Sequence, residues 1–248
     1  MGAQFRQERR RSRRRAAPGR GSGIAPPVAA IIAAGGTGER ARTEPSELLK
    51  QFRSLRGRPM IQWSIDALIR AGCTPIVVAV PAELLDDARG LMSPNAVTVV
   101  EGGSTRQASV ARALEHVSTD RVLVHDASRP LIRVDLVHRV IKALGDARAA
   151  IPALPIEETI KTVSDDRVVG TIFRSGLWRA QTPQGFDTET LRAAHEKAIE
   201  EGFEATDDCG LIERYGGKAA IVWGDRRNLK ITYPEDFDLA EALLGESE

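Results

Sequence analysis

Short apolar runs alternate with helix-like segments from residue 28 to about residue 145, and this alternation constrains the fold more than any other feature. The runs "VAAIIAAGG", "PIVVAV", "VTVV" and "RVLVHDA" are mostly apolar and rich in β-branched residues, as strands buried on both faces are. The segments between them are predicted helices at 59–72, 81–92 and 104–117. Strands that alternate with helices pack as a parallel sheet with right-handed crossovers, so we expect an α/β fold with a three-layer, mostly parallel twisted sheet.

The alternation stops in the second half of the chain. Residues 149–186 contain several extended runs and an Asp-Asp pair at 165–166, without a convincing helical pattern. This favours a hairpin that projects from the sheet, a β-arm at about 154–178. Beyond it, the sequence predicts a strand at 219–224 and helices at 187–202, 207–217 and 234–244. The 248 residues suffice for one sizeable core, so we expect a single domain over 27–248.

Residues 1–26 differ in composition from the rest of the chain. They contain eight arginines and one glutamate, although the whole chain has a formal net charge of only +1. With few large apolar side chains to offset its ordering entropy, this Arg-rich tail is expected to be disordered. It lacks the continuous apolar centre of a secretory signal. Its arginines could bind polyanions nonspecifically or belong to an organelle transit peptide.

Cysteine usage and hydropathy narrow the setting and the partners. Cys73 and Cys209 lie far apart and form no CxxC pattern, so the sequence signals neither a disulfide framework nor a zinc site. We expect a cytoplasmic protein, or a plastid one if the tail is part of a transit peptide. No stretch reaches the about 18 apolar residues that suggest a membrane span, and the near-neutral charge argues against a specific nucleic-acid partner.

Three glycines, Gly35, Gly36 and Gly38, directly follow the first predicted strand. Ligands of open α/β sheets bind at the carboxyl ends of strands, where glycines let backbone N–H groups wrap phosphate oxygens. Arg40 and Lys50 would add positive charge to the same anion. A dinucleotide-binding loop is an alternative, but no acidic residue closes the second strand to hold a ribose. A Walker loop is disfavoured because the GK[ST] ending is missing.

Two further polar clusters follow later strands. In "GGSTRQAS", at 102–109, Ser104 and the glutamine three residues later have capping-box spacing. The same glycines, with Arg106 and Ser109, could instead hold a base or a ribose at a helix N-terminus. In "HDASRP", Asp126 ends a buried strand, where a carboxylate either caps the next turn or meets Mg²⁺ together with substrate phosphates.

Several polar residues later in the chain are uninformative when taken singly, because each type is most often a surface charge or a helix cap. They are Thr159, Lys161, Arg174, Thr182, Thr206, Asp207 and Lys230. The four histidines show no metal-ligand spacing, and no GxSxG elbow supports a Ser-His-Asp triad.

Taken in order, these segments resemble the 2-C-methyl-D-erythritol 4-phosphate cytidylyltransferase family of the non-mevalonate isoprenoid pathway. The resemblance covers about residues 28–244 and rests on "AGGTGER", "KQF", "GGSTRQAS", "VLVHDASRP", "ETIK", "LWRAQTPQGF", "TDD" and "NLKIT". It implies a sheet like that of the nucleotide-diphospho-sugar transferases, with CTP and a sugar-alcohol phosphate as substrates. It also implies Mg²⁺ or another divalent cation, and a homodimer formed through the β-arm.

The resemblance further implies roles for individual residues. The CTP loop would consist of Ala34, Gly35, Gly36 and Gly38, and the nucleoside would meet Gly103, Ser104, Ser109 and Ala127. Asp126 would lie near the metal and the substrate, and Arg129 would face the sugar phosphate. The arm would hold that substrate, across the dimer interface, through Thr159, Lys161 and Arg174. The site would be completed by Thr182 and Thr206, with the catalytic cations Arg40, Lys50 and Lys230.

The chain departs from the family between Arg40 and Lys50, where a few extra residues precede the lysine. We expect this segment to be mobile without ligand and to close on CTP. Ser104 is a second departure, at a position where the family's aspartate varies.

The expected reaction needs no nucleophile from the protein. If a phosphate oxygen of the substrate attacks the α-phosphorus of CTP, the protein must position two anions and neutralise the leaving pyrophosphate. The expected function is therefore cytidylyl transfer from CTP to 2-C-methyl-D-erythritol 4-phosphate. The alternatives are a cytidylyltransferase for a pentitol phosphate such as ribitol 5-phosphate, and a non-catalytic module that binds polyanions.

Overall fold

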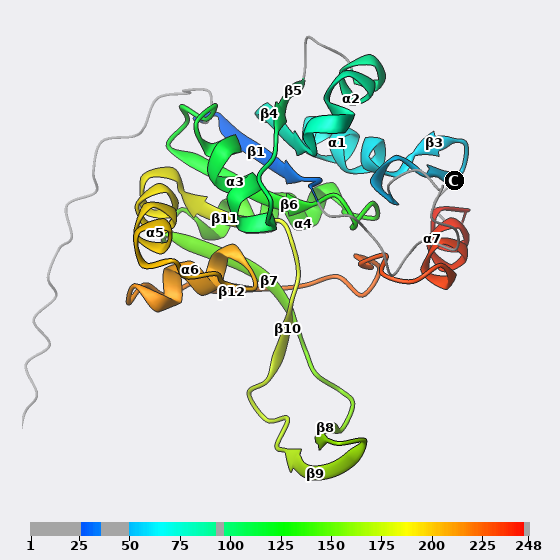
Figure 1. Ribbon diagram of the computed structural model, residues 1–248, viewed down its shortest axis with the longest axis vertical. Helices are drawn as coiled ribbons and strands as arrows, with labels where there is room; N and C mark the ends of the chain where they lie inside the picture. The colour runs from blue at the N-terminus through cyan, green and yellow to red at the C-terminus, as the bar shows by residue number, and fades with distance from the viewer. Residues whose placement is uncertain (1–25, 36–49, 93–96, 246–248) are drawn as a thin grey trace, which may run out of the picture.

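An eight-stranded sheet forms the centre of the computed structural model, which describes residues 26–35, 50–92 and 97–245 (Figure 1). Parallel pairs join β1 (Val28–Ala33) to β4 (Cys73–Val80) and to β6 (Arg121–Asp126), and β4 to β5 (Val97–Glu101). A further parallel pair joins β7 (Ala149–Pro155) to β12 (Ala220–Trp223). The strands β10 (Trp178–Ala180) and β11 (Gln184–Asp187) run antiparallel to their neighbours. The strand order is β10-β7-β11-β6-β1-β4-β5, with β12 beside β7, which confirms the predicted mostly parallel sheet.

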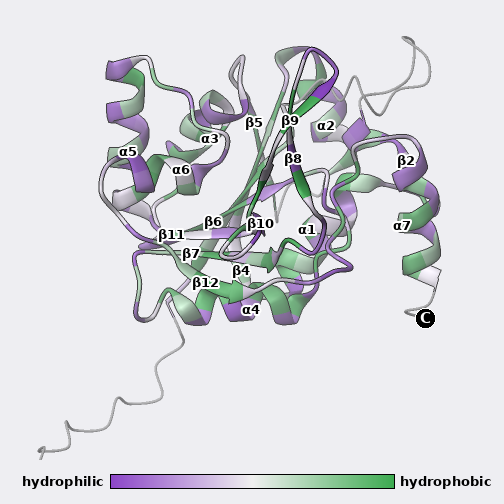
Figure 2. Cartoon of the chain, turned by 90° about the horizontal axis from the view of Figure 1, so that it is seen from below, coloured by the Kyte–Doolittle hydropathy of each residue, from purple (hydrophilic) through white to green (hydrophobic). Residues whose placement is uncertain are grey.

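Helices cover both faces of the sheet, and successive side chains of β1 accordingly point into two different cores. Ala30 and Ile32 face a core shared with α1 (Met60–Arg70), α2 (Leu85–Leu91) and α4 (Val134–Ala143). Ala29 and Ile31 face a second core shared with α3 (Arg106–Leu114), α5 (Thr188–Glu201) and α6 (Asp208–Arg214). Figure 2 shows α3, α5 and α6 on one side of the apolar strands and α4 on the other. The predicted three layers are confirmed.

A third, smaller core fixes the chain on either side of Lys230. The short strand β2 (Ser54–Leu55), which pairs with β3 (Arg58–Pro59), contacts α7 (Glu235–Gly245). The cluster between them includes Leu55, Met60, Leu131, Ile231 and Phe237. At the start of α7, the carboxylate of Asp236 accepts hydrogen bonds from the N–H groups of Thr232 and Tyr233 (2.6 and 2.8 Å). The backbone around Lys230 is therefore anchored both by apolar packing and by a turn.

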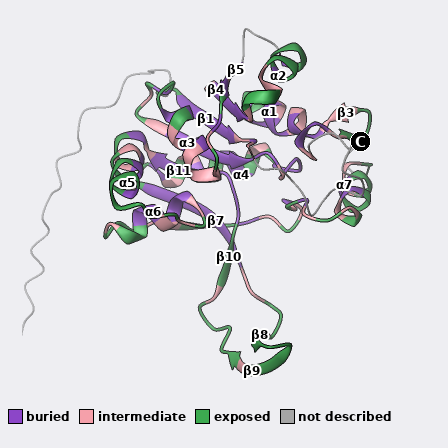
Figure 3. Cartoon of the chain, viewed as in Figure 1, coloured by how far each residue is buried: buried purple, intermediate pink, exposed green. Residues whose placement is uncertain are grey.

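The β-arm projects away from the sheet as a separate hairpin of β8 (Ile160–Ser164) and β9 (Arg167–Ile172) (Figure 1). Asp165 and Asp166 form its turn with positive φ angles of 49° and 58°, as a tight hairpin turn requires. Figure 3 shows the arm as almost entirely exposed, in contrast to the buried strands of the sheet. The predicted hairpin is confirmed, while its role in a dimer stays a prediction.

The start of α3 differs from the prediction. The N-cap is Thr105, whose side-chain oxygen accepts a hydrogen bond from the N–H of Ala108 (3.1 Å). The capping box predicted for Ser104 and Gln107 is therefore wrong. The amide of Gln107 instead bridges to the backbone of Phe203 and Ala205 (both 2.9 Å), which ties α3 to the loop after α5.

None of the helices that the structure describes combines the length and the apolarity needed to cross a bilayer.

Candidate active site

The carboxyl ends of β1 and β5 meet at the buried hydroxyl of Ser109, on α3. This hydroxyl accepts a hydrogen bond from the Gly103 N–H (3.1 Å) and donates one to the Thr105 carbonyl (2.8 Å). A Cβ added at Gly35 would lie 2.7 Å from Ser109 Oγ, and one added at Gly103 would lie 2.3 Å from the Ala108 Cβ. Glycine at these positions therefore lets two loop backbones approach closely, as a cradle for phosphate or nucleotide requires. Ser109 supports this cradle from behind, and its contact with a nucleotide stays a prediction.

The segment that carries Lys50 lies against the same cradle. The short 3₁₀ helix η2 (Lys50–Phe52) places Gln51 so that its amide donates to the Ala34 carbonyl (2.6 Å). The ammonium of Lys50 donates to the Ile231 carbonyl (2.7 Å), next to Lys230. The enlarged segment, two predicted members of the CTP loop, Gly36 and Gly38, and the predicted catalytic cation Arg40 lie outside the described residues.

Asp126, the last residue of β6, lies between two cations. Its Oδ1 is 2.9 Å from Arg106 Nε, and its Oδ2 is 2.9 Å from Lys230 Nζ. Only 12% of its side chain is exposed, whereas 48% of the Lys230 side chain is. Burial alone would raise the pKa of Asp126, but Arg106, Lys230 and Arg129 lower it well below its ordinary value. The carboxylate is therefore ionised at neutral pH and holds both cations at the edge of the sheet.

A buried hydrogen-bond chain fixes the backbone around Asp126. The N–H of Asp126 donates to the Thr182 hydroxyl (3.1 Å), and that hydroxyl in turn donates to His125 Nδ1 (3.0 Å). The other ring nitrogen of His125, Nε2, then carries the proton and donates to the Arg129 carbonyl (3.1 Å). Burial lowers the pKa of His125 to about 4, which keeps the imidazole neutral in this arrangement.

An open cavity of about 190 Å³ at the carboxyl ends of the strands is lined by Arg106, Asp126, Thr182 and Lys230, among other residues. Arg129 points its guanidinium along the wall, donating to the carbonyls of Asn228 (2.8 Å) and Ala180 (3.4 Å). Burial lowers the pKa of Arg129 from its ordinary value. The structure thus brings together five predicted site residues: Asp126, Arg129, Thr182, Thr206 and Lys230.

Other predicted residues lie next to the cavity or away from it. The N–H of Ala127 donates to the Ala33 carbonyl (3.2 Å), which joins the ends of β6 and β1, and Ser104 is exposed on the second glycine loop. The three predicted arm residues, Thr159, Lys161 and Arg174, are exposed and do not line this cavity. Lys161 donates to Thr171 Oγ1 within the arm (2.6 Å), and Figure 1 shows the β8–β9 hairpin projecting away from the sheet.

Sequence reasoning misses the roles of several residues that build the cavity. The sequence suggests Arg106 only as a partner for a base or ribose, although it is the cation that contacts Asp126 Oδ1. Gln181 does not stand out in the sequence, yet its amide pairs with both backbone groups of Asp225 (2.8 and 3.0 Å) and so holds the loop that leads to Lys230. Its position is a weak sequence signal. Gln181, the first residue of "QTPQ", directly follows an extended run, and a polar side chain at such a place can hold a neighbouring loop.

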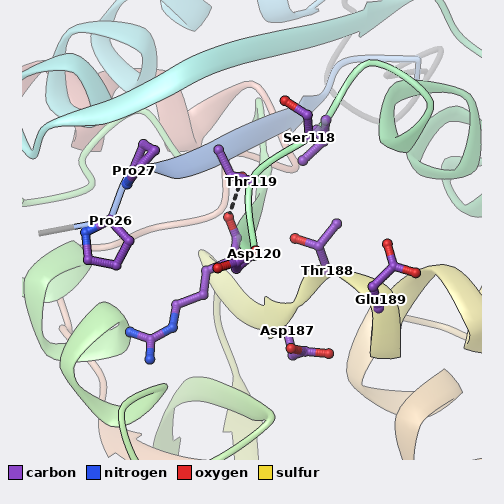
Figure 4. A pocket seen from close by; sticks show the side chains of 10 residues that line it. Pro26, Pro27, Ser118, Thr119, Asp120, Asp187, Thr188 and Glu189 are labelled. Carbon is purple, nitrogen blue, oxygen red and sulfur yellow. Dashed lines mark hydrogen bonds between the residues drawn. The ribbon is translucent and has the colours of Figure 1, made fainter.

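A larger cavity, of about 380 Å³, lies at the opposite end of the sheet (Figure 4). It is lined by the residues before β1 and β6 and by the start of α5, including Thr119, Asp120, Asp187 and Glu189. Its carboxylates would repel a phosphate, and ligands of α/β sheets bind at the other edge. The smaller cavity around Asp126 is therefore the candidate active site.

The sheet, its flanking helices and a cavity lined by Arg106, Arg129 and Lys230 at the carboxyl ends of its strands define an α/β protein with a nucleotidyltransferase-like fold. Residues 28–246 match the family model of 2-C-methyl-D-erythritol 4-phosphate cytidylyltransferase. The chain belongs to this family.

Individual relatives agree with the family match. The chain is 41% identical to 2-C-methyl-D-erythritol 4-phosphate cytidylyltransferase of Thermosynechococcus vestitus, over 86% of this chain and 94% of that protein. It is 42% identical to the bifunctional enzyme IspD/IspF of Dinoroseobacter shibae, over 90% of this chain but only 55% of that protein, so it spans about half of the bifunctional relative. The crystal structure of 2-C-methyl-D-erythritol 4-phosphate cytidylyltransferase from Thermus thermophilus superposes with a TM-score of 0.75 at 36% identity, covering 88% of this chain and 99% of that one.

Proposed function

We propose that the chain transfers the cytidylyl group of CTP to 2-C-methyl-D-erythritol 4-phosphate, giving 4-diphosphocytidyl-2-C-methyl-D-erythritol and pyrophosphate. The observation that carries this proposal is the ionised Asp126, held between Arg106 and Lys230 in a cavity that adjoins two glycine loops. The site offers two kinds of group that bind phosphate: cations held by a carboxylate, and backbone N–H groups of glycine loops. Such a site suits two phosphorylated substrates better than a neutral ligand. The family names the two substrates.

In this proposal each part of the site has a separate task. CTP binds over the two glycine loops, with its phosphates towards Lys50. The sugar-alcohol phosphate binds beside Asp126 and Arg129, with Thr182 and Thr206 along the same wall. Lys230 lies next to Asp126, where it can meet negative charge that develops on the transferring phosphoryl group.

The chemistry requires positioning and charge neutralisation. An oxygen of the sugar-alcohol phosphate attacks the α-phosphorus of CTP, the bond to the β-phosphate breaks, and pyrophosphate leaves. The described lining of the cavity contains no cysteine. Cys209, whose N–H bonds to the lining residue Gln184 (3.1 Å), is itself buried, and burial raises the pKa of its thiol. A covalent enzyme intermediate is therefore not needed and has no activated thiol to support it.

The site suits a divalent cation that is held mainly by the nucleotide. Among the described residues, no three His, Cys, Asp or Glu side chains are grouped as metal ligands. Asp126 would be the nearby carboxylate, with the CTP phosphates as the main ligands, in keeping with the preference of Mg²⁺ for one or two carboxylates plus substrate phosphates. When bound, such a cation neutralises charge on the pyrophosphate leaving group.

We further propose that the β-arm crosses to a second copy of the chain. The arm exposes several large apolar side chains, among them Val169 (64% exposed) and Phe173 (91% exposed). Apolar side chains gathered on a projecting hairpin are typical of an interface rather than of a solvated surface. In such a homodimer Thr159, Lys161 and Arg174 would contribute to the partner's substrate site.

The proposed function is tested by pyrophosphate release from CTP and Mg²⁺ with each of two acceptors, 2-C-methyl-D-erythritol 4-phosphate and ribitol 5-phosphate. We expect release with the first acceptor, little with the second, and none without an acceptor. The Asp126→Asn variant, which keeps the shape of the side chain, should lose most of the activity. Activity with ribitol 5-phosphate alone would overturn the choice of substrate, and no release with either acceptor would overturn the proposed function.

A further inference from the structure

Arg106 joins the active-site cavity to a second, fully buried carboxylate. Its Nε contacts Asp126 Oδ1 (2.9 Å), and its Nη1 contacts Asp208 Oδ2 (2.7 Å). Asp208 is the first residue of α6, and only 1% of its side chain is exposed. Asp208 does not line the cavity, and its ion pair with Arg106 links it to a side chain that does.

Asp208 is in turn held from behind by a buried histidine. Nε2 of His195, on α5, lies 3.2 Å from Asp208 Oδ1, and the His195 side chain is 3% exposed. His195, Asp208, Arg106, Asp126 and Lys230 therefore form one continuous chain of contacts that runs from the helical layer into the cavity. Arg106 and the hydrogen bond from His195 lower the pKa of Asp208, although burial alone would raise it.

Stability alone is a weak explanation for these buried charges. Apolar residues of similar size could often replace a buried ion pair without loss of stability. The arrangement does, however, fix one orientation of the Arg106 guanidinium, because two different carboxylates hold two of its nitrogens. That orientation leaves Asp126 Oδ2 available to Lys230.

Removal of the Asp208 charge would release this constraint. A guanidinium that has one carboxylate partner tends to bind it with two parallel hydrogen bonds. Arg106 would then engage both oxygens of Asp126 and compete with Lys230 for Oδ2. Lys230 would lose its anchor, although every residue that touches substrate would still be present.

We propose that Asp208, held by His195, is a positioning residue for cytidylyl transfer: it orients Arg106 so that Asp126 keeps Lys230 in place. This inference rests on the proposed function, because its readout is turnover of CTP and 2-C-methyl-D-erythritol 4-phosphate. Because Asp208 acts through Arg106 on Asp126 and Lys230, we expect the effect to fall on kcat more than on KM for CTP.

The test compares Asp208→Asn with a matched control on the same two helices. Arg214 on α6 pairs with Glu201 on α5 (3.0 Å), but this ion pair is about half exposed and does not contact Arg106. Glu201→Gln therefore removes a charge that links α5 to α6 without touching the chain of contacts. We expect Asp208→Asn to lower kcat at least about tenfold, with KM for CTP changed less than about threefold, and Glu201→Gln to leave both near wild type.

Two further comparisons separate positioning from general destabilisation. In Arg106→Gln the link is already broken, so adding Asp208→Asn should lower kcat no further. His195→Gln keeps a side-chain N–H donor and should retain more kcat than His195→Leu. If Asp208→Asn fails to fold, the comparison of His195→Gln with His195→Leu tests the proposal instead. Circular dichroism establishes that each variant assayed is folded.

The outcomes are distinct. The positioning role would be overturned if a folded Asp208→Asn variant had the wild-type kcat. It would also be overturned if the losses of Asp208→Asn and Arg106→Gln multiplied in the double variant. In either case, turnover by the wild-type chain would still support the proposed function. If His195→Gln and His195→Leu were equally active, the proposal that His195 holds Asp208 in position would be wrong. A wild-type chain without turnover would overturn both the function and the inference that rests on it.

Discussion

At the scale of single residues, Asp126 is charged in a place where burial alone would favour its neutral form. The contacts from Arg106 and Lys230 reverse that preference, so the pKa of Asp126 lies below its ordinary value. In the proposed mechanism this charge holds Lys230, through an ion pair, beside the reacting phosphates. The site therefore depends on ion pairs among several charged side chains more than on any single reactive group.

Replacement of Lys230 by alanine should lower kcat about 10²-fold or more, since it removes a cation that meets charge developing in the transition state. Lys218→Ala, which removes an exposed lysine that does not line the cavity, is the matched control and should keep wild-type kcat. Steady-state pyrophosphate release measures both variants. Wild-type turnover by Lys230→Ala would exclude its catalytic role.

The stability of the protein should fall as the pH is lowered through the range between the two pKa values of His125. Its pKa is lowered by burial to about 4 in the folded protein, against 6.5 ordinarily, so the unfolded chain binds the proton first on acidification. The contribution of neutral His125 to the free energy of unfolding is therefore complete above about pH 6.5 and is lost towards pH 4. About 2 kcal/mol of this free energy is lost between about pH 7 and about pH 5.

Urea unfolding at several pH values measures this loss. His125→Gln should flatten the pH dependence, whereas His116→Gln, at an exposed histidine, should keep the wild-type slope. A His125→Gln variant with the wild-type slope would show that another group titrates.

The strand-end residues of the site can be located from the sequence, but the groups behind them cannot. Asp126 and Gly103 can be found because they lie at or just after the end of a recognisable strand, and strand ends meet at one edge of a parallel sheet. The role of Arg106 cannot, because it depends on Asp208, which is about a hundred positions away and reaches Arg106 only through the packing of α6. A single sequence carries no signal for such a contact.

At the scale of secondary-structure elements, α3 shows how a cap can be displaced by one residue. Ser104 has the spacing of a capping box, but Thr105 caps the helix, and Gln107 is drawn away to the backbone of Phe203 and Ala205. The local sequence does not distinguish two adjacent residues with similar capping preferences, and the tertiary contacts of Gln107 are incompatible with a capping box. The same limit applies to β10 and β11, whose short runs lack a pattern that would specify their partners.

Thr105→Ala should lower the free energy of unfolding by about 1 kcal/mol through loss of the cap hydrogen bond. Ser104→Ala, at the neighbouring exposed residue, should change it by less than about 0.5 kcal/mol. Urea denaturation of the two variants provides the comparison. A larger loss for Ser104→Ala than for Thr105→Ala would contradict the observed cap.

At the scale of the whole molecule, the three predicted arm residues do not line the cavity of their own chain, so we propose that the site is complete only in a dimer. This can be tested by mixing two inactive variants, Asp126→Asn with an intact arm and the double variant Lys161→Ala, Arg174→Ala with an intact cavity. In a two-fold dimer, random mixing gives heterodimers with one intact site, so about a quarter of wild-type activity should return. No recovery in mixed dimers, identified by sedimentation, would show that each arm serves its own chain or neither.

The central claim is direct transfer of the cytidylyl group between two bound anions, without a covalent enzyme intermediate. The stereochemistry at the α-phosphorus tests it directly, with CTP made chiral there by a single sulfur substitution and 2-C-methyl-D-erythritol 4-phosphate as acceptor. One in-line displacement inverts the configuration, and the account predicts inversion in a product that joins the two substrates. Retention would indicate two successive displacements through a protein nucleophile, and either retention or the absence of this product would contradict the account.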